Sequence, residues 1–422
     1  MGRMKSFSIT YANNQYVYYP GQVVAGQAVL EITDEVTARG LRITLRGEAY
    51  VHWTEQHGSG QHSHTVSYTD RETYVNQCVT VWGKEEGDRE GENPTLYPGI
   101  HTFPFSFQVP HAVPSSLEPK GPFRAHIRYW VTANVDRPWK FDYKCKQPFT
   151  VIARIDINDP VFLTPMRSDN EKHLCCLCCK SGPLNLEASI DRAGYCPGES
   201  VTISATARNM TSRSMRGMRG RLISITTVTA RGHRRTGTTT ICEIMGEELR
   251  GGAFDQWGRR SLAIPPAPPS VKSCRIIDHS YYVQIAVVVP RGINLKILFP
   301  VVIGTVPLRE DEAEAIQSQP QFIDNRSLGV RGVPQAIAMP HEPVVVPSAP
   351  PCYAEAVDEP SVNIGESDDK YTYGNLQYLP RYPYIPTYSQ TNQPWEPGPP
   401  GPPPGEYPMQ PMGGQYFGPP TH

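Results

Sequence analysis

Apolar and polar residues alternate along most of the first three hundred residues. Leu41, Ile43 and Leu45 share one face of an extended segment, while the residues between them are Arg42, Thr44 and Arg46. The same period of two recurs in residues 103–109, 127–135 and 281–289. Strands with this period bury one face and expose the other, which is typical of antiparallel sandwiches. The pattern therefore predicts an all-β body.

An internal repeat divides this body into two parts. Tyr18-Tyr19-Pro20-Gly21-Gln22-Val23-Val24 is echoed by Tyr195-Cys196-Pro197-Gly198-Glu199-Ser200-Val201. In both copies Pro-Gly sets a tight turn before a strand, because proline fixes φ and glycine accepts a positive φ. We expect two similar β-sandwiches in tandem, at residues 1–159 and 182–308. The Cys-rich segment 160–181 is predicted to connect them.

Residues 309–422 differ sharply in composition from the body. They hold 22 of the 43 prolines and 9 of the 22 tyrosines, with 5 Lys or Arg against 14 Asp or Glu. The tail therefore carries a net charge of −9 and the body +8 within a total of −1. A segment with so few aliphatic residues cannot offset its ordering entropy by burial, so we predict a disordered, acidic Pro/Tyr-rich tail.

Two short recruitment motifs overlap in this tail. Pro350, Pro351 and Tyr353 form a PPxY motif, which fits the grooves of WW domains because proline pre-orders the extended chain. Pro347, Ser348, Ala349 and Pro350 form a PSAP motif, the ligand type of the UEV domain of the ESCRT-I complex. The motifs share Pro350, so both sites cannot be fully occupied at once.

A second, degenerate WW-binding motif follows about thirty residues later. Leu379, Pro380 and Tyr382 form an LPxY sequence. A second weak site matters because tethering raises the effective concentration of the next binding event. An equally strong interpretation is that these residues belong to solvated Tyr-Pro repeats.

Cysteines cluster in the predicted connector, at Cys175, Cys176, Cys178 and Cys179. Three interpretations remain open: small residues packed at the domain junction, S-acylation that attaches the body to a membrane, or a metal or redox site. A zinc site would need a second CxxC pair some fifteen residues away, and the sequence has none. We therefore predict no metal and no cofactor.

The second predicted domain begins with many arginines. They are candidates for contact with phosphate or anionic lipid, because guanidinium groups pair bidentately with phosphate; a solvated strand face is the alternative. No aromatic residues are interleaved as stacking platforms, so nucleic acid is not an expected partner. The candidate residues are Arg208, Arg213, Arg216, Arg219, Arg221, Arg231, Arg234 and Arg235.

In combination, these features resemble the alpha-arrestin (arrestin domain-containing) branch of the arrestin family. The resemblance covers about residues 5–308, and Pro350–Ala356 extends it into the tail. It implies two immunoglobulin-like sandwiches that act as a ubiquitin-ligase adaptor for membrane cargo. The residues that carry it are Tyr18–Gly26, Leu96–Phe105, Gly194–Glu199, Ile264–Pro269 and Ile303–Leu308.

From the sequence we predict a cytoplasmic adaptor that is recruited to the plasma membrane and endosomes. It would link receptors or transporters to HECT-class ubiquitin ligases through their WW domains. One alternative is a vesicle-budding adaptor that recruits ESCRT-I through PSAP. Another is a redox scaffold resembling the thioredoxin-binding member of the family, although no cysteine lies between Glu243 and Ser273. An enzyme is not expected, because phosphate-cradling glycine loops, GxSxG and HExxH are absent from the sequence.

Overall fold

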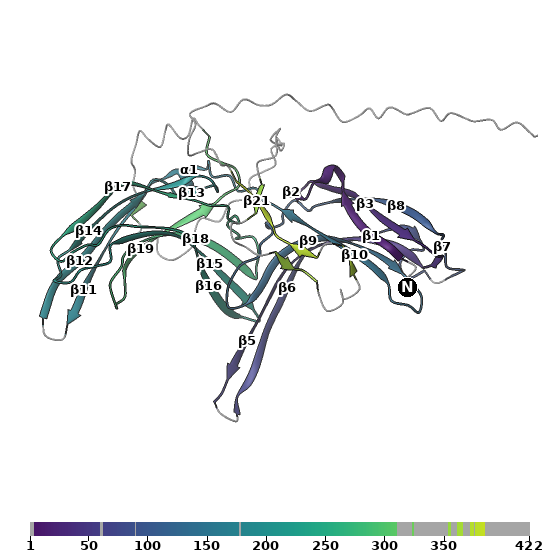
Figure 1. Cartoon of the computed structure of the whole chain (residues 1–422), viewed down its shortest axis with the longest axis horizontal. Coiled ribbons are helices and arrows are strands. Elements are labelled where there is room, and N and C mark those ends of the chain that lie inside the picture. Colours follow the sequence, from purple (N-terminus) through teal and green to yellow (C-terminus); the bar gives the residue numbers. More distant parts are fainter. Residues whose placement is uncertain are drawn as a thin grey trace, which may run out of the picture.

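The structure, a computed structural model, describes residues 4–59, 62–88, 90–176, 179–309, 323–324, 353–355, 361–365, 372–374 and 376–384. Two β-sandwiches lie side by side along the long axis of the molecule (Figure 1). Within the described residues the helical elements are η1 (Ala12–Asn14) and α1 (Pro160–Leu163). Neither is long or apolar enough to cross a membrane.

The N-terminal sandwich packs a three-stranded sheet against a larger one. The smaller sheet has the order β1 (Met4–Tyr11), β3 (Val23–Ile32), β8 (Gly99–Gln108). The larger sheet has the order β2 (Val17–Tyr18), β10 (Tyr143–Val151), β9 (Arg124–Asp136), β5 (Gly40–His57), β6 (His64–Gly83). β4 (Val36–Thr37) pairs with β7 (Thr95–Leu96). The β5–β6 hairpin projects well beyond the body (Figure 1).

The C-terminal sandwich has two five-stranded sheets. One has the order β17 (Phe254–Ala263), β14 (Ser200–Asn209), β12 (Cys179–Ile190), β11 (Met166–Cys176), β20 (Ile323–Asp324). The other has the order β13 (Gly194–Tyr195), β19 (Leu295–Ile303), β18 (Ile277–Val287), β15 (Met218–Ala230), β16 (His233–Met245). The predicted all-β fold with two tandem sandwiches is confirmed.

The alternation of apolar and polar residues in the sequence matches the alternation of buried and half-buried side chains along the strands. Leu41, Ile43 and Leu45 are fully buried in β5, whereas the polar residues between them are half-buried. Tyr281, Val283, Ile285 and Val287 form a matching buried row in the C-terminal core. Because successive side chains of a strand point to opposite faces, one row fills each sandwich and the other faces outward.

The Pro-Gly repeat marks equivalent turns in the two sandwiches. Gly21 has φ +84° and Gly198 has φ +98°, values that L side chains rarely adopt. In each turn the backbone closes a hydrogen bond across four residues, from Gln22 N to Tyr19 O and from Glu199 N to Cys196 O. The repeat in sequence is thus a repeat in backbone geometry.

The predicted connector at residues 160–181 needs a correction. Most of this segment is strand β11, which pairs with β12 inside the C-terminal sandwich from Met166↔Ile190 to Cys176↔Cys179. The chain therefore passes between the sandwiches after β10 and before α1, because Ile155 O already accepts from Thr305 N and Phe162 O on α1 accepts from Ala193 N. The cysteine-rich end of the predicted connector lies at the tip of the β11–β12 hairpin.

The two sandwiches share a tightly packed boundary. Val228, Ala230, Val271 and Ile277 of the C-terminal sandwich belong to the same buried apolar cluster as the N-terminal core. A carboxylate crosses the boundary as well: Glu72 on β6 accepts hydrogen bonds from the backbone N of Arg275 (2.9 Å) and from its Nε (3.2 Å). Burial and charged hydrogen bonds together hold the two halves in one body.

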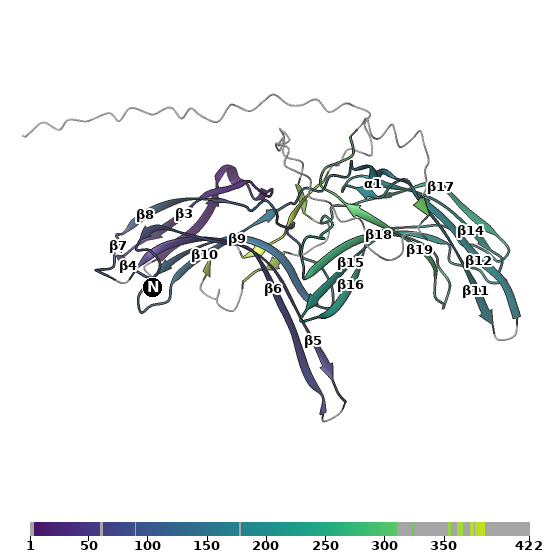
Figure 2. The same ribbon diagram turned by 180° about the vertical axis from the view of Figure 1, so that it is seen from behind.

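Parts of the tail return to the N-terminal sandwich. β21 (Tyr353–Glu355) pairs with β25 (Arg381–Pro383), β22 (Val362–Asn363) pairs with β24 (Gln377–Tyr378), and β23 (Thr372–Tyr373) pairs with β10. These strands lie beside the N-terminal sandwich in both views (Figure 1 and Figure 2). For these strands and for β20, which lies in the predicted tail and pairs with β11, the prediction of a disordered tail is corrected. Most of the rest of the predicted tail lies outside the described residues.

Candidate functional site

The PPxY motif ends in strand β21. Tyr353 lies opposite Pro383, Ala354 opposite Tyr382 and Glu355 opposite Arg381 in an antiparallel pair. The other residues of the two overlapping motifs, Pro347, Ser348, Ala349, Pro350 and Pro351, lie outside the described residues. The structure thus places the end of the first motif directly against the second one.

The second motif is buried against the N-terminal sandwich. Tyr382 is 2% exposed and packs in one apolar cluster with Val17 and Ile152. Its hydroxyl donates a hydrogen bond to Ser116 O at 3.2 Å. Pro380 is buried and Leu379 is half-buried. Tyr382 and Pro380 are therefore withdrawn from solvent, whereas Leu379 is only partly covered.

A second tyrosine, which the sequence analysis did not single out, anchors the same segment. Tyr378 is 5% exposed, and its hydroxyl donates to Phe149 O at 3.2 Å. Thr150 Oγ1 lies 3.4 Å from this hydroxyl and accepts a hydrogen bond from Arg381 N. Burial raises the pKa of Tyr378, so it stays a neutral donor at any physiological pH. The close spacing of three tyrosines is the sequence feature that could have identified Tyr378 as an anchor; they are Tyr373, Tyr378 and Tyr382.

The cysteine cluster lies at the tip of the β11–β12 hairpin. Cys176 pairs with Cys179 across the hairpin and Cys175 pairs with Lys180, while Cys178 lies outside the described residues. The tip points away from the N-terminal sandwich, at the far end of the molecule (Figure 1). The interpretation as residues packed at the domain junction is therefore wrong about the location.

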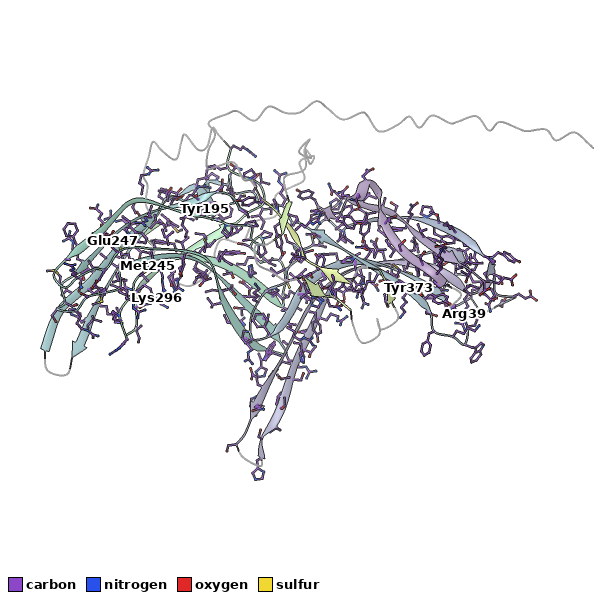
Figure 3. The ribbon with its side chains drawn as sticks, viewed as in Figure 1. Arg39, Tyr195, Met245, Glu247, Lys296 and Tyr373 are labelled. Atoms are coloured by element: carbon purple, nitrogen blue, oxygen red, sulfur yellow. The ribbon has the colours of Figure 1, made fainter. Side chains whose placement is uncertain are left out.

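The predicted arginine patch is split into two groups by strand β15. Arg219 and Arg221 lie on β15 near its start, whereas Arg231, Arg234 and Arg235 lie at the turn into β16. A strand of 13 residues is about 40 Å long, so the groups cannot bind one small ligand. The first group lies at the end of the sandwich where Figure 3 shows Met245, which is paired with Arg219. Three further exposed arginines flank this group: Arg208, Arg213 and Arg216.

The second arginine group contributes to the contact between the sandwiches. Arg235 lies 3.6 Å from Glu55 on the β5–β6 hairpin. Beside it, the ring of His233 packs on Tyr68, with 4.5 Å between the ring centroids. Part of the positive charge that the sequence analysis assigned to phosphate or lipid contact therefore lies in the contact between the sandwiches.

The loop between β9 and β10 exposes two large aromatic side chains. Trp139 is 100% exposed and Phe141 is 83% exposed, with Lys140 between them. Defined contacts nonetheless hold the loop in place. The Asp142 carboxylate accepts a hydrogen bond from Arg137 N (3.0 Å), and the Arg137 guanidinium carbon lies 3.5 Å from the centroid of the Tyr143 ring. We define Arg137–Phe141 as the aromatic loop. Sequence reasoning missed it, although a tryptophan beside a lysine in a turn is a signal for an interfacial contact.

The aromatic loop sits at the outer end of the N-terminal sandwich. It follows Asp136, whose carboxylate accepts from Arg39 at 2.9 Å, and Figure 3 shows Arg39 at that end. Trp139 adopts φ +59°, an uncommon conformation for a bulky residue. Exposure combined with backbone strain indicates a loop that is shaped for contact rather than for packing.

Comparison with known proteins identifies both sandwiches. Residues 7–158 match the model of the arrestin (or S-antigen) N-terminal domain, and residues 180–308 match that of the C-terminal domain. Arrestin domain-containing protein 4 of Mus musculus is 31% identical over 363 residues, covering 85% of this chain and 83% of the relative. Arrestin domain-containing protein 17 of Caenorhabditis elegans is 32% identical over 319 residues, covering 73% and 72%. Thioredoxin-interacting protein of Rattus norvegicus is 26% identical over 404 residues, covering 92% and 96%.

Proposed function

The chain belongs to the family of arrestin domain-containing proteins, and we propose that it is an adaptor that links membrane cargo to WW-domain HECT ubiquitin ligases. Receptors or transporters are the proposed cargo, and their ubiquitination, endocytosis and endosomal sorting are the proposed outcome. The single observation that carries this proposal is the PPxY motif of Pro350, Pro351 and Tyr353 on a chain with two arrestin sandwiches.

The chemistry of the motif supports ligase capture. Two prolines fix an extended chain with little ordering entropy left to lose, and the tyrosine occupies a second pocket of the WW domain. A ligase held this way modifies lysines by proximity, so the adaptor itself supplies no catalytic group. Membership in the arrestin family supports a scaffold rather than an enzyme in the same way.

The aromatic loop supports the proposal that the protein binds a membrane surface. Trp139 and Phe141 offer apolar area, while Arg137 and Lys140 offer positive charge beside it. Aromatic rings favour the headgroup region of a bilayer, and adjacent cations are attracted to anionic lipid. We propose that the protein is cytoplasmic and is recruited to the plasma membrane and endosomes, partly through this loop.

The test is binding of a peptide of residues 346–388 to isolated WW domains and to a UEV domain. WW binding that is lost in the Tyr353→Ala peptide supports the ligase adaptor. A peptide that binds the UEV domain alone, with or without Tyr353, contradicts it and favours an ESCRT-I-recruiting adaptor that uses Pro347–Pro350. Changing Ser348 and Ala349 should weaken UEV binding only.

The redox-scaffold alternative rests on the likeness to thioredoxin-interacting protein. Mixed disulfides form by thiolate attack, so a partner thiol must ionise. Burial raises the pKa of Cys242 to about 11 and also raises the pKa of Cys274. Both thiols therefore stay protonated at neutral pH, which disfavours thioredoxin exchange at these positions.

A further inference from the structure

We propose that the N-terminal sandwich contains a binding site for the chain's own Tyr/Pro-rich segment, residues 372–374 and 376–383, and that occupation of this site withholds Tyr382 from WW domains. We call this segment the docked segment. The claim about withholding rests on the proposed function, because it matters only if WW domains bind these motifs. The claim about docking does not.

The site has an apolar seat for Tyr382. The ring packs with Val17, which pairs with Thr150 between β2 and β10, and with Ile152, which follows β10. The hydroxyl donates to Ser116 O. Tyr382 is thus held at both its ring and its hydroxyl. A tyrosine fits here better than a phenylalanine, because Ser116 O would otherwise lose this donor.

A chain of hydrogen bonds also holds the segment at Tyr378, which precedes Tyr382 in the sequence. The single hydroxyl proton of Tyr378 goes to Phe149 O, so Thr150 Oγ1 donates to Tyr378 and accepts from Arg381 N. Thr150 is 2% exposed, and its hydroxyl links the Tyr378 hydroxyl to the backbone N of Arg381. These contacts fit an extended segment that carries a tyrosine immediately before the LPxY sequence.

The first part of the docked segment extends the larger N-terminal sheet. β23 pairs in parallel with β10, with Thr372 opposite Lys144 and Tyr373 opposite Cys145. β2 occupies the other part of the same edge of β10, at Thr150 and Val151. Strand addition of this kind supplies affinity through the main chain, while the tyrosine seats supply specificity.

A glycine permits the close approach that follows β23. Gly374 has φ +102°, and a Cβ added to it would lie 2.4 Å from Lys146 O and 3.1 Å from Cys145 Sγ. Lys146 Nζ also donates to Ile364 O at 3.4 Å, which holds the neighbouring tail turn over the same edge. A side chain at position 374 therefore conflicts with docking and leaves both WW motifs unchanged.

Docking and WW capture exclude one another for a geometric reason. A WW domain encloses the tyrosine of its ligand in a pocket, whereas Tyr382 is already enclosed by the sandwich. In addition, β21 pairs with β25, so the backbone of Tyr353 is engaged by the docked segment. When only a fraction of a protein is competent to bind, the apparent affinity falls by that fraction.

The experiment uses the full chain and a matched pair of glycine variants. Gly374→Val should undock the segment. Gly365→Ala is the control, because its Cβ meets only the side chains of Asn363 and Leu376 and no positive φ is involved. The first readout needs no WW domain: the rate of trypsin cleavage after Arg381, followed by mass spectrometry of the fragment that begins at Tyr382.

Docking protects this bond, because the Arg381 amide is hydrogen-bonded and Tyr382 is buried. We expect cleavage in the wild-type chain and in Gly365→Ala to be at least about tenfold slower than in the free peptide 346–388, and Gly374→Val to approach the peptide. Equal rates in the wild-type chain and in the peptide would overturn the docking site.

The second readout is the affinity for an isolated WW domain in a Tyr353→Ala background, which reports on Tyr382 alone. The Tyr353→Ala peptide should bind at least about tenfold more tightly than the Tyr353→Ala chain, and Gly374→Val should restore the peptide's affinity to the chain. A peptide that does not bind, or a chain that binds equally well, overturns the withholding of Tyr382. If the wild-type peptide also fails to bind, the proposed function fails, while protection of Arg381 still decides docking.

A substitution on the sandwich tests the same site from the other side. Thr150→Val removes the hydroxyl that links Tyr378 to Arg381 and keeps the side-chain shape. Thr227→Val on β15 is its control, because that hydroxyl contacts the hydroxyl of Thr236 on β16. Faster cleavage after Arg381 in Thr150→Val alone supports the site; equal effects of the two changes would contradict it.

Discussion

The contact between Glu72 and Arg275 leads to a prediction that separates a backbone contact from an ion pair. Glu72 is mostly buried, at 12% side-chain exposure, whereas the Arg275 side chain is 81% exposed. The carboxylate accepts from the backbone N of Arg275 at 2.9 Å and from the guanidinium at 3.2 Å. The prediction is that the backbone bond, not the ion pair, stabilises the boundary between the sandwiches.

The magnitudes follow from exposure. A hydrogen bond from a backbone N–H to a charged group contributes about 1.5–3 kcal/mol, and its loss leaves a donor unsatisfied. An ion pair with a largely exposed guanidinium contributes about 0–1 kcal/mol. We therefore expect Glu72→Ala to cost about 2 kcal/mol and Arg275→Ala to cost below about 0.5 kcal/mol, because the alanine keeps its backbone N–H.

Two assays measure this difference. The first is the midpoint of urea unfolding for both single variants and the double variant, with Glu86→Ala, an exposed loop carboxylate, as the control. The second is hydrogen exchange at the amide of residue 275. A loss of about 2 kcal/mol corresponds to roughly 30-fold faster exchange in Glu72→Ala, with little change in Arg275→Ala. Equal destabilisation by the two single variants would refute the reasoning.

Three further predictions concern pH, membranes and modification. Burial lowers the pKa of His279 from 6.5 to about 4, so the unfolded state binds a proton first as pH falls. Urea unfolding should therefore show a loss of up to about 3 kcal/mol between pH 6.5 and 4, and a shallower loss in His279→Gln. Replacing Trp139 and Phe141 by serine should weaken sedimentation with vesicles that contain phosphatidylserine by at least about tenfold, whereas Phe254→Ser, which changes an exposed ring on β17, should not. If the hairpin-tip cysteines are S-acylated, hydroxylamine-sensitive labelling should disappear when Cys175, Cys176, Cys178 and Cys179 become serine. It should persist in Cys78→Ser, which changes an exposed thiol on β6. Labelling that persists in the fourfold variant contradicts acylation at the tip.

The neutral state of His279 has a visible cause. Tyr281 donates its hydroxyl proton to Pro268 O, so the His279 Nε2 proton points to the tyrosine oxygen. Thr226 Oγ1 lies 2.8 Å from Nδ1 and fills the other side. Burial is the largest cause of the lowered pKa; the Asp278 carboxylate raises the pKa and Lys272 lowers it, and both effects are smaller.

The sequence by itself determined the fold class and the repeat. Leu41, Ile43 and Leu45 alternate with polar residues, and this local pattern is sufficient to say which face of the strand is buried. Gly21 and Gly198 occur where the backbone needs a positive φ, a requirement that depends only on neighbouring residues. Properties that arise within a few residues can be read from the chain.

Only the tertiary structure decided which candidate residues meet and which remain open. Tyr382 is buried by Val17, Ser116 and Ile152, residues more than two hundred positions away in the chain. The arginines after Arg208 look like one cluster in the sequence, but β15 separates them by its length. A contact between distant segments carries the entropy cost of closing the long loop between them, and the sheets that provide the site offset this cost. No local pattern in the sequence encodes such a contact.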